Sequence, residues 1–150
     1  MNWWISFHYD RIFMSQPSRR TARVTVFRVL YQRAKIGTNP AGEMILFREA
    51  ELSEKEVNFA KTLIDKTWSE LEAIDQAIQK NLKNWKQSRL ADGLNALLRM
   101  ALAEIFFFPK VEGKIVINDT LEICRSHVDK QAIKICNGVL NAAWKEHSPQ

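Results

Sequence analysis

Proline and glycine, the residues that most readily end or interrupt a helix, are scarce in this chain of 150 residues. The four prolines stand at positions 17, 40, 109 and 149, and only Gly42 and Gly93 interrupt the stretch between the second and the third. These positions divide the chain rather than break its apolar segments, which predicts long helices. With 46% apolar residues and an ordinary charged fraction of 26%, the chain can bury the core of one globular domain.

Apolar residues recur at the spacing of one helix face throughout the chain. The strongest stripe consists of Leu90, Leu94, Leu97, Leu98, Ala101, Leu102 and Ile105. Helices are expected over residues 19–36, 53–71, 74–85, 90–108, 118–128 and 130–145, with a short one at 43–51. Ser53 and Asn118 are the expected N-caps of two of them. Residues 114–117 are β-prone but have no partner strand, so the chain is predicted to be all-α with six or seven helices.

Positive charge is concentrated at the start of the chain. The first 35 residues contain seven Lys and Arg against Asp10 alone, a charge of +6, whereas the whole chain carries +5. The charge is densest at Arg19, Arg20 and Arg23, where a helix is expected to begin. Arginine there opposes the helix dipole, so a structural role alone would not favour it. The pattern indicates a site for a polyanion and favours nucleic acid, with a merely solvated basic arm as the alternative.

The helical phase of the arginines predicts their environment. Arg19 and Arg23 fall near the apolar side of the expected helix, in its first turn. An arginine cannot be buried there without a partner. We therefore expect the first turn to project past the helical bundle and to leave these arginines free for a ligand.

Several functional classes are not supported by the sequence. Cys124 and Cys136 are too few for a disulfide scaffold and are expected to be packed core thiols in a reducing cytoplasm. No secretory signal or membrane-spanning stretch is evident. The chain shows no nucleotide-binding or nucleophile motif, and its histidines share no metal-ligand spacing with the cysteines. The protein is therefore expected to have no catalytic residue, cofactor or metal.

Two aromatic groups stand apart from the helical pattern. Residues 1–18 are interpreted as an N-terminal extension, with five aromatic residues in the first 13 positions. Either Met14 is the natural start of the protein, or the extension is an aromatic arm that packs on the body. Phe106, Phe107 and Phe108 together cover every side of a helix end, so at least one ring is expected to be exposed to a partner or to that arm. The alternative is that the loop at 109–117 covers them.

Five segments in consistent order resemble the NusB family of bacterial transcription antitermination factors. The first is the arginine cluster at 19–23, followed by Leu30 and Tyr31. Phe59 with Leu63 and then Ile74 with Asp75 are similar to the family's middle helices. The remaining segments are Leu98–Ile105, Ile115–Ile123 and Cys136–Leu140, and the resemblance covers residues 19–145.

The resemblance implies a fold and a set of partners. It implies two packed helical subdomains, about 19–72 and 73–148, within a single domain at 19–148. It also implies binding of boxA-type single-stranded RNA jointly with NusE, a small-subunit ribosomal protein, and entry into the RNA polymerase antitermination complex during ribosomal RNA transcription. Family members can dimerise, so a monomer or a homodimer is expected.

Most residue roles follow from the same resemblance, whereas Arg28 is added because of its charge on the basic first helix and Phe106 because of the aromatic run. The predicted RNA-binding residues are Arg19, Arg20, Arg23 and Arg28. The predicted partner-binding residues are Tyr31, Asp92, Glu104 and Phe106, and Glu104 also matches a signature position with a mainly structural role. Two alternatives remain: a free-standing NusB-like targeting module of an RNA methyltransferase system, and a helical protein–protein interaction module that uses residues 106–108.

Overall fold

The computed structural model describes residues 17–148, and within this range it contains seven α-helices, one short 3-10 helix and no strand. The predicted all-α fold is confirmed. The predictions made for residues 1–13 lie outside the described residues. The elements are α2 (Pro17–Ile36), α3 (Pro40–Ala50), α4 (Glu54–Ser69), α5 (Leu71–Lys80), η1 (Gln87–Arg89), α6 (Asp92–Phe107), α7 (Gly113–His127) and α8 (Ala132–His147).

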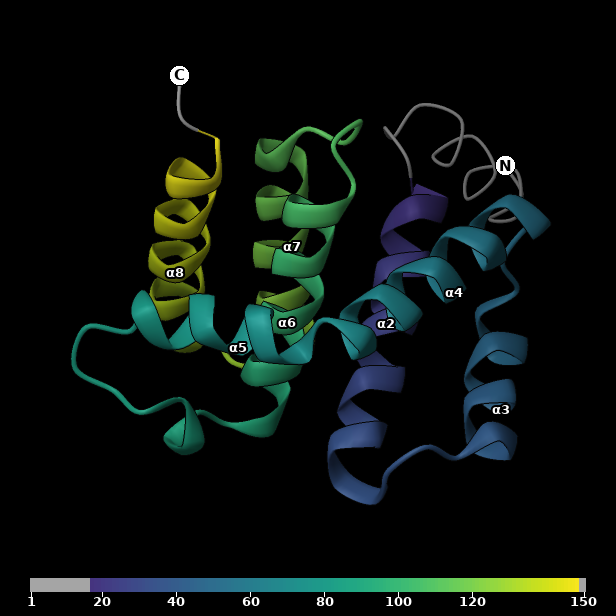
Figure 1. Cartoon of the computed structure of the whole chain (residues 1–150). Helices are drawn as coiled ribbons and strands as arrows, with labels where there is room; N and C mark the ends of the chain where they lie inside the picture. Colours follow the sequence, from purple (N-terminus) through teal and green to yellow (C-terminus); the bar gives the residue numbers. More distant parts are fainter. Residues whose placement is uncertain (1–16, 149–150) are drawn as a thin grey trace, which may run out of the picture.

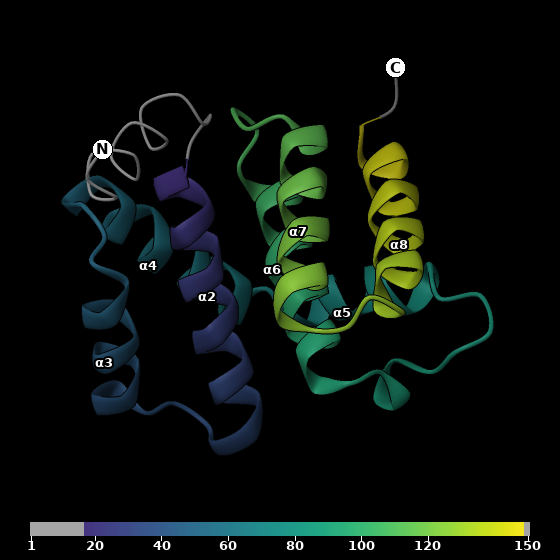
Figure 2. The same cartoon turned by 180° about the vertical axis from the view of Figure 1, so that it is seen from behind.

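The helices form two groups that share α6 (Figures 1 and 2). On one side, α2 packs against α3, α4 and α6. On the other side, α6 packs against α5, α7 and α8, and α7 and α8 pack on each other. Because α6 contacts both groups, the subdomain boundary at residue 72 stays a prediction.

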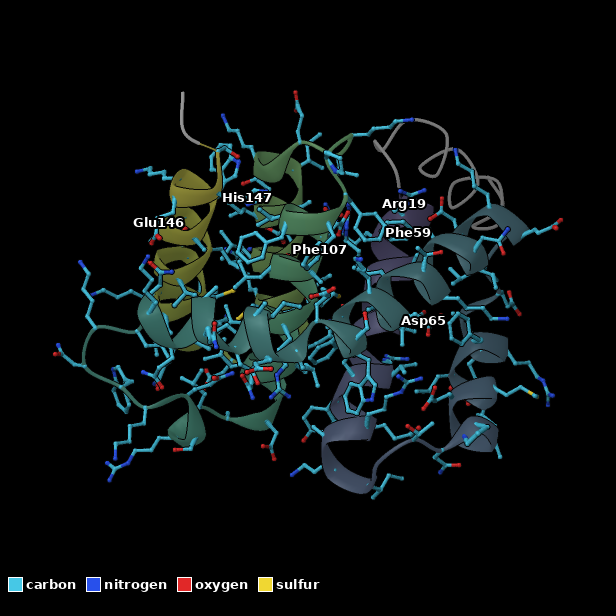
Figure 3. All side chains as sticks on the ribbon, viewed as in Figure 1. Arg19, Phe59, Asp65, Phe107, Glu146 and His147 are labelled. Atoms are coloured by element: carbon cyan, nitrogen blue, oxygen red, sulfur yellow. The ribbon has the colours of Figure 1, made fainter. Side chains whose placement is uncertain are left out.

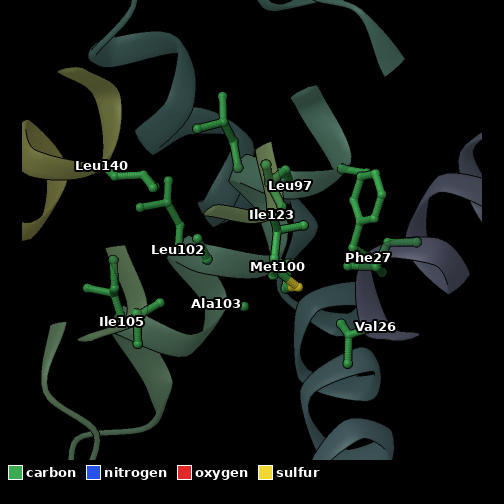
Figure 4. Close-up of a cluster of buried hydrophobic side chains, with 14 of the residues drawn as sticks. Val26, Phe27, Leu97, Met100, Leu102, Ala103, Ile105, Ile123 and Leu140 are labelled. Atoms are coloured by element: carbon green, nitrogen blue, oxygen red, sulfur yellow. The ribbon is translucent and has the colours of Figure 1, made fainter. Parts of the chain in front are cut away.

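The hydrophobic core is centred on α6, which is apolar on almost every side. Ten of its sixteen residues are buried, from Leu94 to Ile105 with few interruptions. A helix that is apolar all round is stable only when neighbours enclose it. Figure 4 shows Leu97, Met100 and Leu102 of α6 between Phe27 of α2 and Leu140 of α8.

The helix boundaries differ from the sequence prediction mainly at α5, which ends at Lys80 and not at residue 85, and at the start of α7. Helix α7 begins at Gly113, so Asn118 lies inside it and is not an N-cap. The β-prone segment at 114–117 is helical because Val116 and Ile117 are buried against the core, and such tertiary packing overrides a weak strand preference. The predicted cap at Ser53 is confirmed, since its hydroxyl accepts a hydrogen bond from the Glu56 N–H at 3.3 Å. In a capping box the Glu56 side chain would bond back to the Ser53 N–H. Here the Glu56 carboxylate pairs with Arg19.

The expectation of an exposed ring among Phe106, Phe107 and Phe108 is wrong, because all three are half-buried. The Phe108 ring lies edge-on to Phe59 with centroids 6.0 Å apart, and the Phe106 ring lies 4.8 Å from the ring of His147. These contacts come from α4 and α8, which lie on either side of the end of α6. Distant helices therefore cover the aromatic end of α6.

The two cysteines are free and buried, as expected of core thiols. A hydrogen bond with Cys136 lowers the pKa of the Cys124 thiol. Residues 17–148 contain no helix long and apolar enough to cross a membrane. The same residues contain no group of three or more His, Cys, Asp or Glu side chains arranged to hold a metal ion.

Candidate nucleic-acid interface

Arg23 is buried at the junction of α2, α6 and α7, with only 2% of its surface exposed. Its Nε and Nη2 donate to the two carboxylate oxygens of Glu104 at 2.8 and 2.6 Å. Its Nη1 donates to Oδ2 of Asp119 at 2.5 Å. Burial lowers the pKa of Arg23, but the hydrogen bonds and charges of Glu104 and Asp119 outweigh burial and hold that pKa above its ordinary value.

The two neighbouring arginines also have carboxylate partners. Nε and Nη2 of Arg19 donate to the Glu56 carboxylate at 2.6 and 3.2 Å, and its guanidinium lies 3.8 Å from the centre of the Phe59 ring (Figure 3). Nε of Arg20 donates to Oδ1 of Asp119 at 2.9 Å, while 45% of the Arg20 side chain stays exposed. Arg20 is therefore the arginine of the three that is most accessible to a ligand.

The expectation that the first turn of α2 overhangs the bundle with free arginines is wrong. Three cations, Arg19, Arg20 and Arg23, meet three carboxylates of α4, α6 and α7. The arginines lie near the apolar side of α2 because that side faces acidic groups of other helices. Charge at this end of α2 is thus locally balanced, and an anion that binds there must compete with carboxylates.

A hollow of about 570 Å³ opens beside this cluster. It lies between α2, the loop after α6 and the first half of α7. Its lining comprises Arg19, Arg20, Arg23, Lys110, Val111, Glu112, Ile115, Asn118 and Asp119. Lys110 is an exposed cation that sequence reasoning missed, because nothing in its local sequence shows that the loop returns to α2. The Asn118 amide, expected to cap a helix, lines this hollow and offers both a donor and an acceptor.

Arg28 lies apart from the arginine cluster, on an exposed part of α2 beside a second hollow of about 540 Å³. This hollow is lined by Phe27, Arg28, Tyr31, Gln32, Lys35, Ile36, Leu46, Gly93 and His127. Tyr31 lies at the edge of this hollow, and 38% of its surface is exposed. The Lys35 ammonium, which shares this hollow, pairs with the Asp92 carboxylate at 2.6 Å. The structure thus brings Tyr31, Arg28 and Asp92 to one region.

The other two predicted partner-binding residues lie elsewhere. Glu104 is fully buried beneath Arg23, so the prediction that it contacts a partner is wrong and its role is to hold that arginine. Phe106 borders a separate hollow between α5 and α8, together with Ala73 and His147. Its contact with a partner stays a prediction.

The fold and the site define a class of small all-helical proteins in which the first turn of α2, together with α7 and the loop before it, frames a polar hollow lined with cations. The NusB family model matches residues 20–145, and the chain belongs to the NusB family.

Individual relatives agree with this assignment. The chain is 35% identical over 132 residues to the transcription antitermination protein NusB of Aquifex aeolicus, which covers 86% of this chain and 88% of the relative. Its fold is similar to T. maritima NusB, with a TM-score of 0.77 at 26% identity, covering 87% of this chain and 93% of the other. It is also similar to a chain of the crystal structure of antitermination factors NusB and NusE in complex with dsRNA, with a TM-score of 0.78 at 31% identity, covering 86% and 97%.

Proposed function

We propose that this protein is a transcription antitermination factor that binds boxA-type single-stranded RNA together with NusE and acts on RNA polymerase during ribosomal RNA transcription. It acts in the cytoplasm and catalyses no reaction. The relative from Aquifex aeolicus is named as an antitermination protein, and a structural relative is solved with NusE and dsRNA, which supports NusE and RNA as partners. The observation that carries the proposal is the hollow where Arg19, Arg20 and Lys110 converge. The methyltransferase-targeting alternative is not favoured.

The RNA backbone is proposed to enter the hollow beside α2. Arg20 and Lys110 present exposed cations to successive phosphates, and Arg19 joins them when a phosphate replaces the Glu56 carboxylate. The Asn118 amide can read the edge of an unstacked base, as sequence-specific recognition of single-stranded RNA requires. Arg23 is excluded from direct contact by its burial and serves to hold Asp119, which in turn orients Arg20.

NusE is proposed to bind the region of the second hollow. Phe27, Ile36 and Leu46 give this hollow an apolar lining, and Tyr31 lies at its edge. The Lys35–Asp92 pair adds two exposed charges. An aromatic group with an apolar floor and a charged rim is typical of a protein interface.

Replacing both Arg20 and Lys110 by alanine is expected to weaken RNA binding about tenfold or more, because each substitution removes a cation that pairs with a phosphate. Fluorescence anisotropy of a boxA-like RNA, measured with and without NusE at several salt concentrations, checks this. The slope of log affinity against log salt should shrink by about 0.7 for each phosphate of a single strand that is no longer neutralised. The same RNA as a duplex tests the preference for single strands.

The matched control for this experiment is Arg125→Ala, which removes a cation of similar exposure from α7, outside the hollow. Its binding should stay within twofold of the unmodified protein. Equal affinities for the double variant and this control would refute the proposed RNA site.

Glu56→Gln is expected to change stability and RNA affinity in opposite directions. The substitution removes the carboxylate that holds Arg19, which is only 18% exposed in its side chain. We expect a loss of about 1–3 kcal/mol in the free energy of unfolding, as for a hydrogen bond to a charged group. RNA affinity should rise several-fold, because a phosphate no longer competes with Glu56 for Arg19. Chemical denaturation and the anisotropy assay measure the two effects.

Glu54→Gln provides the control, since it makes the same charge change two residues away in the exposed first turn of α4. A rise in affinity of equal size in both variants would show a general charge effect, and the specific competition between Glu56 and phosphate would then be wrong.

A further inference from the structure

The segment between α5 and α6 displays a tryptophan among cations. Trp85 is 53% exposed, and Lys83, Lys86 and Arg89 around it are exposed as well. Residues 81–91 contain no Asp or Glu. A single exposed aromatic ring is common on protein surfaces, but a ring that stands among cations is the arrangement that single-stranded nucleic acids bind.

The segment is held in place by its backbone and by two glutamines. Nε2 of Gln79 donates to the Trp85 carbonyl at 3.0 Å, and Oε1 of Gln79 accepts from the Gln87 N–H at 2.9 Å. Nε2 of Gln87 donates in turn to carboxylate and amide oxygens of Asp75 and Asn95, at 2.8 and 2.9 Å.

The anchoring continues into α6 and the core. Arg99 of α6 holds Asp75 through two hydrogen bonds of 2.8 Å, and Leu82 anchors the start of the segment with 7% exposure. The indole of Trp85 is therefore displayed on a tethered segment and is not part of a loose loop.

The positive charge of this segment is not balanced by the protein. Within residues 17–148, Lys83, Lys86 and Arg89 take part in no ion pair, whereas Lys80 before them pairs with Glu146 at 2.7 Å. The arginines of α2 show the reverse, since each of Arg19, Arg20 and Arg23 has a carboxylate partner. This segment has three cations in seven residues, and none has a carboxylate partner. Each of them should therefore attract a phosphate more strongly than an arginine of α2 that is already paired.

The position of the segment separates it from the first site. η1 lies at the end of the molecule opposite to the N-terminal turn of α2 in both views (Figures 1 and 2). We propose that Lys83, Trp85, Lys86 and Arg89 form a second contact for single-stranded RNA, in which the Trp85 ring stacks on a base and the cations neutralise the neighbouring phosphates. This inference rests on the proposed function only for the choice of RNA as the nucleic acid.

Single-stranded RNA fits the segment better than a protein does. Trp85 is the one large hydrophobic side chain exposed between α5 and α6, and its neighbours are polar or charged. A stable protein interface needs a much larger apolar core than one ring supplies. A base needs only one accessible ring face, and stacking tolerates any sequence.

The test uses the full chain with two RNAs, a short boxA-like RNA and a single-stranded uridine 20-mer. Trp85→Ala is expected to weaken binding of the uridine 20-mer about five- to a hundredfold, the range for loss of one stacked base. Trp85→Phe should recover most of that loss, because it keeps a stacking face. The variant with alanine at positions 83, 86 and 89 should lower the salt slope by about 2.

The outcomes separate this inference from the proposed function. If Trp85→Ala leaves uridine 20-mer binding within twofold, or if it weakens only NusE binding, the second contact does not exist. The variant with alanine at 20 and 110 should lose about tenfold or more in affinity for the short boxA-like RNA, while its binding of the uridine 20-mer should still depend on Trp85. If the unmodified protein does not bind the boxA-like RNA but still binds the uridine 20-mer through Trp85, the proposed function alone is overturned. Thermal melts should match for the Trp85 variants and for the variant changed at 83, 86 and 89, since these side chains are exposed.

Discussion

Glu104→Gln should lower the free energy of unfolding by about 3–5 kcal/mol, the cost of breaking a buried ion pair. Glu104 is fully buried, and both of its carboxylate oxygens accept hydrogen bonds from Arg23. With glutamine at this position, the Arg23 guanidinium stays buried but faces only the charge of Asp119, and one amide hydrogen points at a cation. Urea unfolding followed by far-UV circular dichroism measures the loss.

Two controls identify the cause of this loss. Glu122→Gln breaks the exposed pair with Arg125 and should cost less than about 1 kcal/mol. The double variant Arg23→Met with Glu104→Leu should be more stable than Glu104→Gln, because it removes both fully buried charges and leaves Asp119 paired with Arg20. A loss below about 1 kcal/mol for Glu104→Gln would mean that water or a rearranged side chain satisfies Arg23, contrary to the expected cost of a buried unpaired charge.

Gly113→Ala should destabilise the protein by about 1–3 kcal/mol through overpacking. A Cβ at this position would lie 2.6 Å from Cδ1 and 2.9 Å from Cε2 of the Trp144 ring, so α7 or the ring must move. α7 also carries Ile115, Asn118 and Asp119 into the proposed RNA site, and its displacement should weaken RNA binding as well. The unfolding and anisotropy measurements described above test both effects.

Gly138→Ala is the matched control, with the opposite expected sign. Nothing lies within 4 Å of a Cβ there, and Gly138 is exposed in the middle of α8. Alanine should therefore stabilise the protein by about 0.5–1 kcal/mol through its higher helix propensity. A stabilising effect of Gly113→Ala would show that Trp144 moves aside without cost.

The buried ion cluster links the fold to the proposed function. Arg23 of α2 joins Glu104 of α6 and Asp119 of α7, and Asp119 also holds the partly exposed Arg20. Arg20, which is expected to contact phosphate, is thus oriented by Asp119 and Arg23, which are themselves buried. Such support favours a defined geometry at a binding site.

The sequence alone was sufficient for the helical fold and for the family. The apolar stripe from Leu90 to Ile105 predicted the central helix, and Ser53 predicted the start of α4 at Glu54. These features depend on residues three or four positions apart, so local physics determines them. The family resemblance likewise depends on the order of short motifs, and the NusB family model covers residues 20–145.

The environment of the arginines was decided by tertiary structure. The sequence contains two charged residues at positions that favour burial, since Arg23 lies near the apolar side of its helix and Glu104 lies within the most apolar helix. Nothing local connects them, because 81 residues separate Arg23 from Glu104 and 96 separate it from Asp119. Lys110 and Trp85 are similar cases, since their exposure depends on where the loops run. Ion pairing and burial depend on distances through space, and the packing of α2 on α4, α6 and α7 determines those distances.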